Sequence, residues 1–115
     1  MDFPIDIGSY VNLKLNGKGK LSESELETLS KNIDLVRDAV IATTAFARAK
    51  GLGGHTGGPY DIVPETLIVD SLREGGTKIH DEFFDEAGHR SALQYVRGVV
   101  RGKMDSEKLL HYREY

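Results

Sequence analysis

The strongest chemical signal in this sequence is a glycine-dense stretch with a single histidine, Gly51-Leu52-Gly53-Gly54-His55-Thr56-Gly57-Gly58. Glycine lets backbone amides come close to a bound anion, and an imidazole changes its charge near neutral pH. A second glycine–histidine pair, Gly88-His89, lies downstream within the segment AGHR. Each pair is expected to lie between two elements of secondary structure. Together the two pairs predict a site for a polyanion.

Each histidine also has a purely structural interpretation. The glycines around His55 are compatible with a helix stop followed by a tight turn, but they leave a structural imidazole few side chains to pack against. His89 follows a glycine at the expected start of a helix, where free amides favour an anion, and it would serve equally as a helix cap. The stretch around His55 fits neither GxGxxG nor the Walker pattern, which excludes the common nucleotide-binding loops.

The remaining candidate groups give weaker signals. His80 and His111 are interpreted as surface residues, because one lies in a charged stretch and the other on a polar terminal helix. No serine lies in a GxSxG elbow, so a serine nucleophile is unsupported. A carboxylate group at positions 81–86 matches no compact ligand loop, so we interpret it as a solvated face and assign no metal site there. Its members are Asp81, Glu82, Asp85 and Glu86.

The chain of 115 residues is long enough for one domain with a single core. Its formal net charge is -3, with 15 basic and 18 acidic residues mixed along the chain, so nucleic-acid binding is disfavoured. The absence of cysteine excludes disulfides and thiolate metal sites and suits a reducing compartment. The N-terminus lacks a signal-peptide pattern, and no run reaches the ~20 apolar residues that span a bilayer. We therefore expect a cytoplasmic protein without a membrane partner.

Residues 1–21 are expected to form an N-terminal arm or hairpin that precedes the domain proper. Weak alternation from Tyr10 to Leu15 runs into Asn16-Gly17, which is a strong turn signal. Such an arm is typical of an interface. Residues 22–115 are expected to form the domain itself.

The domain is expected to begin with a long amphipathic helix. Ser22 and Glu25 have the spacing of a capping box, and apolar residues then recur at helical spacing until the helix ends near Gly51. The second half of this helix, 39–49, is rich in small residues, which favours tight packing against another element.

The elements after the glycine stretch predict an α/β fold. We expect a helix from Pro64 to Gly75, a short strand over 82–85, a third helix from Ala92 to Gly102, and a last helix capped by Asp105 or Ser106 and running through Tyr112. Alternation of helices with a strand is typical of α/β proteins with crossover connections. Only one strand signal is visible, so the fold is expected to be mostly helical with few strands.

Taken in order, these elements and motifs resemble the N-terminal part of transketolase-like thiamine diphosphate enzymes. The resemblance covers most of residues 32–115 and is carried by GLGGHTGG, by the helix that begins near Val63-Pro64-Glu65, by AGHR and by the ending MDSEKLLHYREY. It implies an incomplete N-terminal part of the thiamine diphosphate-binding fold, from its pyrophosphate-binding domain. It also implies a transferase that moves ketol groups between phosphorylated sugar substrates.

The resemblance implies roles for both glycine–histidine pairs. His55 matches a histidine that faces the substrate and the reactive thiazolium and assists proton transfer. His89 matches a second histidine near the diphosphate of the cofactor and the substrate, and Gly54 and Gly88 would allow the close approach. Thiamine diphosphate, bound with magnesium, would supply the carbanion chemistry.

The resemblance also implies that the active site needs a second chain. The sequence ends at Tyr115, before the family segments that bind magnesium and the diphosphate and before the pyrimidine-binding domain with its activating glutamate. We therefore expect no magnesium ligands in this chain and no activity in isolation. A companion chain, or a homo-oligomer, is expected to complete the site. A partial fold leaves apolar faces uncovered, which also predicts self-association or a partner.

Two other functions stay open on the sequence. GLGGH is also similar to the corresponding loop of a decarboxylating 2-oxoacid dehydrogenase component, although Gly57-Gly58-Pro59 after the histidine favours transketolase. Thr56 stands where transketolases commonly have proline, so the substrate stays open between a sugar phosphate and an oxoacid. The other alternative is a noncatalytic interaction module on the same scaffold, which would bind or regulate a complete relative.

Overall fold

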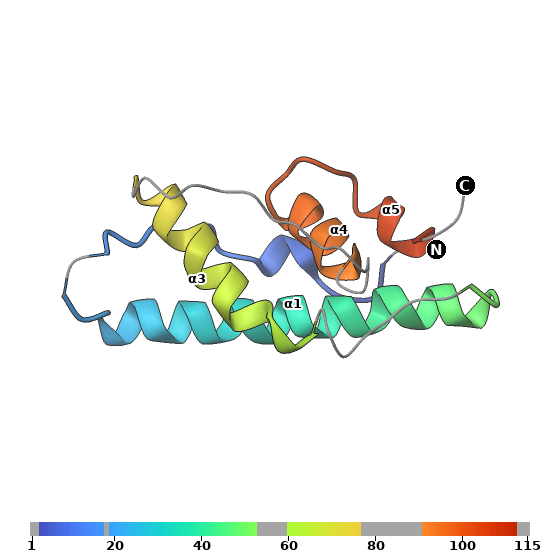
Figure 1. The fold of residues 1–115 in the computed structure, drawn as a ribbon, viewed down its shortest axis with the longest axis horizontal. Coiled ribbons are helices and arrows are strands. Elements are labelled where there is room, and N and C mark those ends of the chain that lie inside the picture. Colours follow the sequence, from blue (N-terminus) through green and yellow to red (C-terminus); the bar gives the residue numbers. More distant parts are fainter. Residues whose placement is uncertain (1–2, 18, 53–59, 77–90, 113–115) are drawn as a thin grey trace.

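The computed structural model describes residues 3–17, 19–52, 60–76 and 91–112, and within these ranges the protein is helical. The longest element is α1, and the shorter α-helices α3, α4 and α5 all contact it. Their bounds are Glu23–Ala49 for α1, Val63–Glu74 for α3, Ser91–Val100 for α4 and Glu107–Leu110 for α5, and a 3-10 helix, η1, spans Ile7–Ser9. Figure 1 shows α1 running along the length of the molecule as a scaffold for the other elements.

The expected α/β fold is wrong for the part of the chain that the structure describes. No strand occurs in residues 3–17, 19–52, 60–76 or 91–112. The physical reason is that the shorter helices pack directly on α1, so their apolar stripes cover one another without an intervening sheet. The strand expected at 82–85 lies outside the described residues.

Local hydrogen bonds set both ends of α1. The Ser22 hydroxyl accepts from the Glu25 N–H at 3.1 Å, and the Glu25 carboxylate accepts from the Ser22 N–H at 2.8 Å. At the other end Gly51 has a φ of 77°, and the Leu52 N–H donates to the Ala47 carbonyl at 2.9 Å. This is a Schellman ending, which glycine adopts readily because it has no Cβ. The predicted helix from the capping box to Gly51 is confirmed.

The shorter helices follow the sequence-based prediction with one difference in length. α3 carries Pro64 in its first turn and ends at the glycine pair that starts with Gly75. α4 ends just before Gly102, which has a φ of 73°. α5 is a single turn that ends at Leu110, short of the predicted end at Tyr112.

The core lies where α1 faces α3, α4 and α5. Residues of α1 at helical spacing form one side of it, and the shorter helices close over them. The buried apolar cluster consists of Leu29, Val36, Ala39, Val40, Ala47, Val63, Leu67, Ala92, Leu93, Val96, Val99, Leu109 and Tyr112. Because this cluster includes residues from the helices before and after both glycine–histidine stretches, the described helices that flank the stretches share one core.

The N-terminal arm crosses the helices as an irregular segment that Asn32 of α1 holds. The Asn32 side-chain amide donates to the Val11 carbonyl at 2.8 Å, and its Oδ1 accepts from the Val11 N–H at 3.0 Å. One buried side chain therefore satisfies both backbone groups of a single arm residue. Further along the arm, the Leu15 N–H donates to the Ser71 carbonyl of α3 at 2.9 Å. The arm is thus tied to both helices.

Replacing Asn32 with alanine is expected to lower the free energy of unfolding by about 1–2 kcal/mol. The Val11 N–H and carbonyl lose their partners, and water compensates in part because Val11 is 54% exposed. The measurement is urea denaturation, with Asn12→Ala as the matched control because Asn12 is an exposed neighbour of Val11. Equal losses of stability in the two variants would contradict the proposed role of Asn32.

Candidate functional site

The residues predicted to form the site all lie outside the described residues, and these are Gly54, His55, Gly88 and His89. The same holds for His80 and for the carboxylates at positions 81–86. The described helices show instead how the chain is positioned before and after each glycine–histidine stretch.

Both described ends of the first stretch are attached to α1. Leu52, which follows the Schellman ending, is half-buried and packs against the core cluster. The chain resumes at Tyr60, whose ring lies 4.6 Å beneath the Arg37 guanidinium and whose carbonyl accepts from Arg37 Nε at 3.5 Å. Arg37 and Ala47 are separated by roughly 15 Å along the axis of α1. The described residues on either side of the stretch that contains His55 therefore contact α1 near its end and near its middle.

The second stretch leads directly into α4. This helix begins at Ser91, two positions after His89 in the sequence. Ala92 and Leu93, in its first turn, are fully buried in the core cluster, which anchors the start of the helix. The first N–H groups of a helix lack partners within the helix and carry partial positive charge. Helix starts are in general suited to contact with an anion.

The highest density of charge among the described residues lies in a buried cluster between α3 and α4, which we call the Asp70 cluster. Arg97 donates from Nε to Asp70 Oδ2 at 2.8 Å and from a terminal nitrogen to Oδ1 at 2.5 Å, which makes a bidentate pair. Arg73 donates to the same Oδ1 at 3.2 Å. Arg101 lies 3.9 Å from that oxygen and 3.8 Å from Glu74. The side chains of Asp70 and Arg97 are only 4% and 7% exposed.

Sequence reasoning missed the Asp70 cluster, although the helical pattern contains a signal for it. Asp70 lies one turn after Thr66 and Leu67 on the buried face of α3, and Arg97 lies one turn after Leu93 on the buried face of α4. A charge at a position where the helical period predicts burial needs an ionic partner. Two such positions of opposite sign on neighbouring helices indicate a buried pair.

Tyr10 of the arm is half-buried beside this cluster. Burial raises the pKa of Tyr10 above its ordinary value of 10.0, the charge of Asp70 raises it further, and Arg101 and Arg97 act in the opposite direction. The phenol is therefore protonated at neutral pH and does not act there as a base. Because the pKa is higher in the folded protein, this group contributes stability that is fully present below pH about 10 and is lost as the pH rises from there through the raised pKa of the folded state. We therefore interpret the Asp70 cluster, with Tyr10 beside it, as a structural ion cluster.

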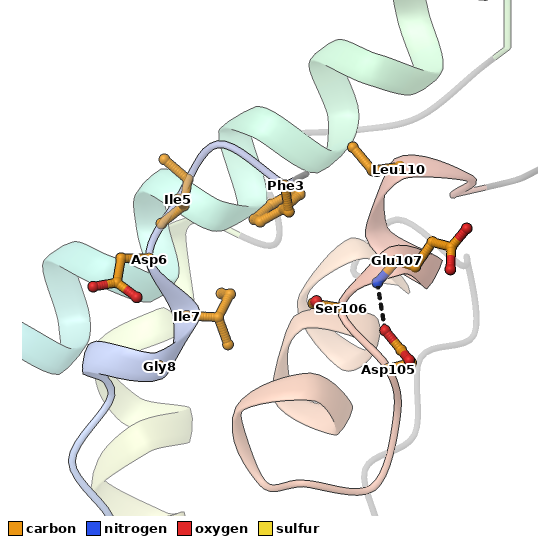
Figure 2. Close-up of a pocket in the computed structure, with 9 residues that line it drawn as sticks. All are labelled: Phe3, Ile5, Asp6, Ile7, Gly8, Asp105, Ser106, Glu107 and Leu110. Carbon is orange, nitrogen blue, oxygen red and sulfur yellow. Dashed lines mark hydrogen bonds between the residues drawn. The ribbon is translucent and has the colours of Figure 1, made fainter. Parts of the chain in front are cut away.

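A cleft with a volume of about 590 Å³ lies between the N-terminal arm and α5 (Figure 2). Phe3 and Ile7 point from the arm toward α5, whereas Asp6 points away from α5. The Asp105 carboxylate accepts from the Glu107 N–H at 2.9 Å. The cleft has the size of a small-molecule site, but the carboxylates around it do not converge on one point.

Among the described residues, no three histidine or carboxylate side chains lie close enough together to hold a metal ion. None of the helices within those residues has the length and apolar character needed to cross a bilayer. Comparison with protein-family models, with curated proteins and with solved structures found no match to this chain.

Proposed function

We propose that this chain is one part of a transketolase-like thiamine diphosphate enzyme that transfers ketol groups between sugar phosphates, and that a companion chain completes its active site. The chain would contribute His55 and His89 to that site. The proposal starts from the two glycine–histidine stretches in the sequence and from their order along it.

The observation that carries the proposal is that both stretches are bounded by segments packed on α1. The first begins after the ending of α1 at Gly51, and the chain is again in contact with α1 at Tyr60. The second leads into α4, which shares its buried core with α1. The described residues that flank both stretches pack against the same helix, which supports a common site.

Each chain would supply a separate part of the chemistry. Thiamine diphosphate stabilises a carbanion on the transferred group when it is bound. His55 would move a proton at the substrate, a role that suits an imidazole near neutral pH. His89, just before α4, would donate a hydrogen bond to the diphosphate together with the free N–H groups of the helix start. The magnesium ligands would come from the companion chain.

The test is calorimetric titration with thiamine diphosphate and magnesium. The chain is titrated alone and then mixed with a companion chain that carries the magnesium and diphosphate segment and the pyrimidine-binding domain. Binding is expected only in the mixture. His55→Ala should reduce ketol transfer by a factor of roughly 10²–10⁴ with little change in cofactor affinity. His89→Ala should weaken cofactor binding by about 10–100-fold, the effect of losing one hydrogen bond to a charged group.

The matched control is His111→Gln, because His111 is an exposed histidine at the end of α5. This variant should bind the cofactor and transfer ketol groups as the unmodified chain does. Turnover by the purified chain alone would refute the need for a companion. Absence of binding in the mixture would refute the proposed function.

A noncatalytic interaction module is the second candidate, and one observation favours it. The described helices bury a continuous apolar cluster of their own, so they form a core without help from another chain. In that case the chain should bind a complete transketolase-like enzyme and change its activity. His55→Ala and His89→Ala should leave this effect intact, which separates the two functions.

A further inference from the structure

The outer face of α1 carries three exposed residues seven positions apart, Asp34, Ile41 and Arg48, which we call the α1 outer stripe. Seven residues are almost two turns of an α-helix, so the three side chains share one face with a drift of about 20° per step. The buried residues of α1, such as Val36 and Thr43, lie on the opposite face. Ile41 is 46% exposed and is the large apolar side chain of this stripe. The described elements therefore leave this stripe uncovered.

We propose that a second copy of this chain docks on the α1 outer stripe, with the two α1 helices antiparallel. The stripe is self-complementary, because Asp34 and Arg48 lie at equal distances, roughly 10 Å, on either side of Ile41. A two-fold axis at Ile41 places one Ile41 against the other. The same rotation places each Asp34 beside Arg48 of the second copy. A single arrangement therefore forms two ion pairs, each between a carboxylate and a guanidinium.

The charges and sizes along the stripe favour this occupant. Within the described residues neither Asp34 nor Arg48 takes part in an ion pair or a side-chain hydrogen bond. Ala45, also exposed, lies one turn after Ile41 and lets two helices approach closely. Residues seven positions apart drift by about 20° around a straight helix. Two helices that wind around each other in a left-handed supercoil compensate this drift, so the same face stays in contact. An antiparallel arrangement is required, because a parallel one would bring like charges together.

The interface is small, so the association is expected to be weak. A contact of a few helical turns buries well under the ~800 Å² per partner of a standard interface. We expect a dissociation constant on the order of tens of micromolar or weaker. The proposal does not depend on the proposed enzymatic function, because its test contains neither cofactor nor companion chain.

Sedimentation velocity across a range of protein concentrations tests the proposal. The unmodified chain should pass from monomer to dimer as its concentration rises. Asp34→Arg and Arg48→Asp, each alone, should shift this transition to at least tenfold higher concentration, because each creates two like-charge contacts. The double variant should restore the original transition, since it exchanges the charges while keeping each pair. Glu27→Arg is the matched control, because it makes the same change of charge on α1 as Asp34→Arg. The two-fold rotation places Glu27 opposite a position beyond Ala49, where α1 ends, so no contact within the helix pair is reversed.

The remaining outcomes are equally decisive. Ile41→Glu should give a monomer at all concentrations with an unchanged melting curve, because Ile41 contributes nothing to the buried cluster. A chain that stays monomeric up to about 1 mM, well above the range expected for weak interfaces, would overturn the proposal. A dimer that both single charge reversals leave intact, or that the double variant fails to restore, would overturn it as well.

Discussion

Asp70→Asn is expected to lower the free energy of unfolding by about 3–5 kcal/mol, a large part of the stability of a typical domain. The substitution keeps the shape of the side chain but removes its charge. Asparagine keeps one acceptor oxygen but carries an NH2 group in place of the other, so Arg97 stays buried without its bidentate carboxylate and Arg73 loses the negative charge that it faces. An uncompensated buried charge costs far more than the pair contributes. Chemical denaturation with urea measures the loss.

A double-mutant cycle separates the pair from general effects of substitution. Arg97→Met alone should cost a similar amount, and the double variant with Asp70→Asn should cost clearly less than the sum of the two. The exposed pair of Lys31 and Glu27, 3.1 Å apart on α1, provides the control, because Glu27→Gln should change stability very little. A loss for Asp70→Asn no larger than that of Glu27→Gln would show that the cluster is open to solvent.

Gly75→Ala is expected to destabilise the protein by about 2–3 kcal/mol, although alanine has the higher intrinsic helix propensity of the two residues. Gly75 has an ordinary φ of -79°, so the backbone conformation is not the reason. A Cβ at this position would overlap the Leu15 carbonyl oxygen and lie 2.6 Å from its carbon and 2.9 Å from the Leu15 nitrogen. The neighbour is backbone, which cannot rotate away, and it is held by the bond from Leu15 to Ser71.

Gly98→Ala is the matched substitution in the interior of α4. There the atoms nearest to the new Cβ belong to the Met104 side chain, at 3.5 Å, which is ordinary contact. The variant should gain up to about 1 kcal/mol from helix propensity. Urea denaturation of both variants gives the comparison. Similar changes in stability for the two glycines would contradict the close approach of the arm to α3.

Helix ends were predictable because the interactions that form them are local in sequence. The capping box at Ser22 and the glycine at Gly51 lie within a few residues of the groups they satisfy. Both partners of each of these interactions therefore lie within one short segment of the sequence. The length of α5 was overestimated, because the periodic residues Leu109 and Tyr112 are both buried but only the first lies within the helix.

The candidate site was predictable only as residue types and order. His55 and His89 are notable in the sequence because glycines surround them, and the described helices on either side of them pack on α1. The Asp70 cluster was missed because it joins residues 27 positions apart, and the pairing follows only when the buried faces of both helices are considered together.

The sequence by itself determined the helices, their caps and the order of the glycine–histidine stretches, since each depends on contacts between residues a few positions apart. The tertiary structure alone decided that helices rather than a sheet cover α1 among the described residues. It also decided that Asp70 is paired while Asp34 is exposed, although both are aspartates on amphipathic helices. The physical reason is that burial depends on which helix faces cover one another, and that arrangement minimises exposed apolar surface over the whole chain.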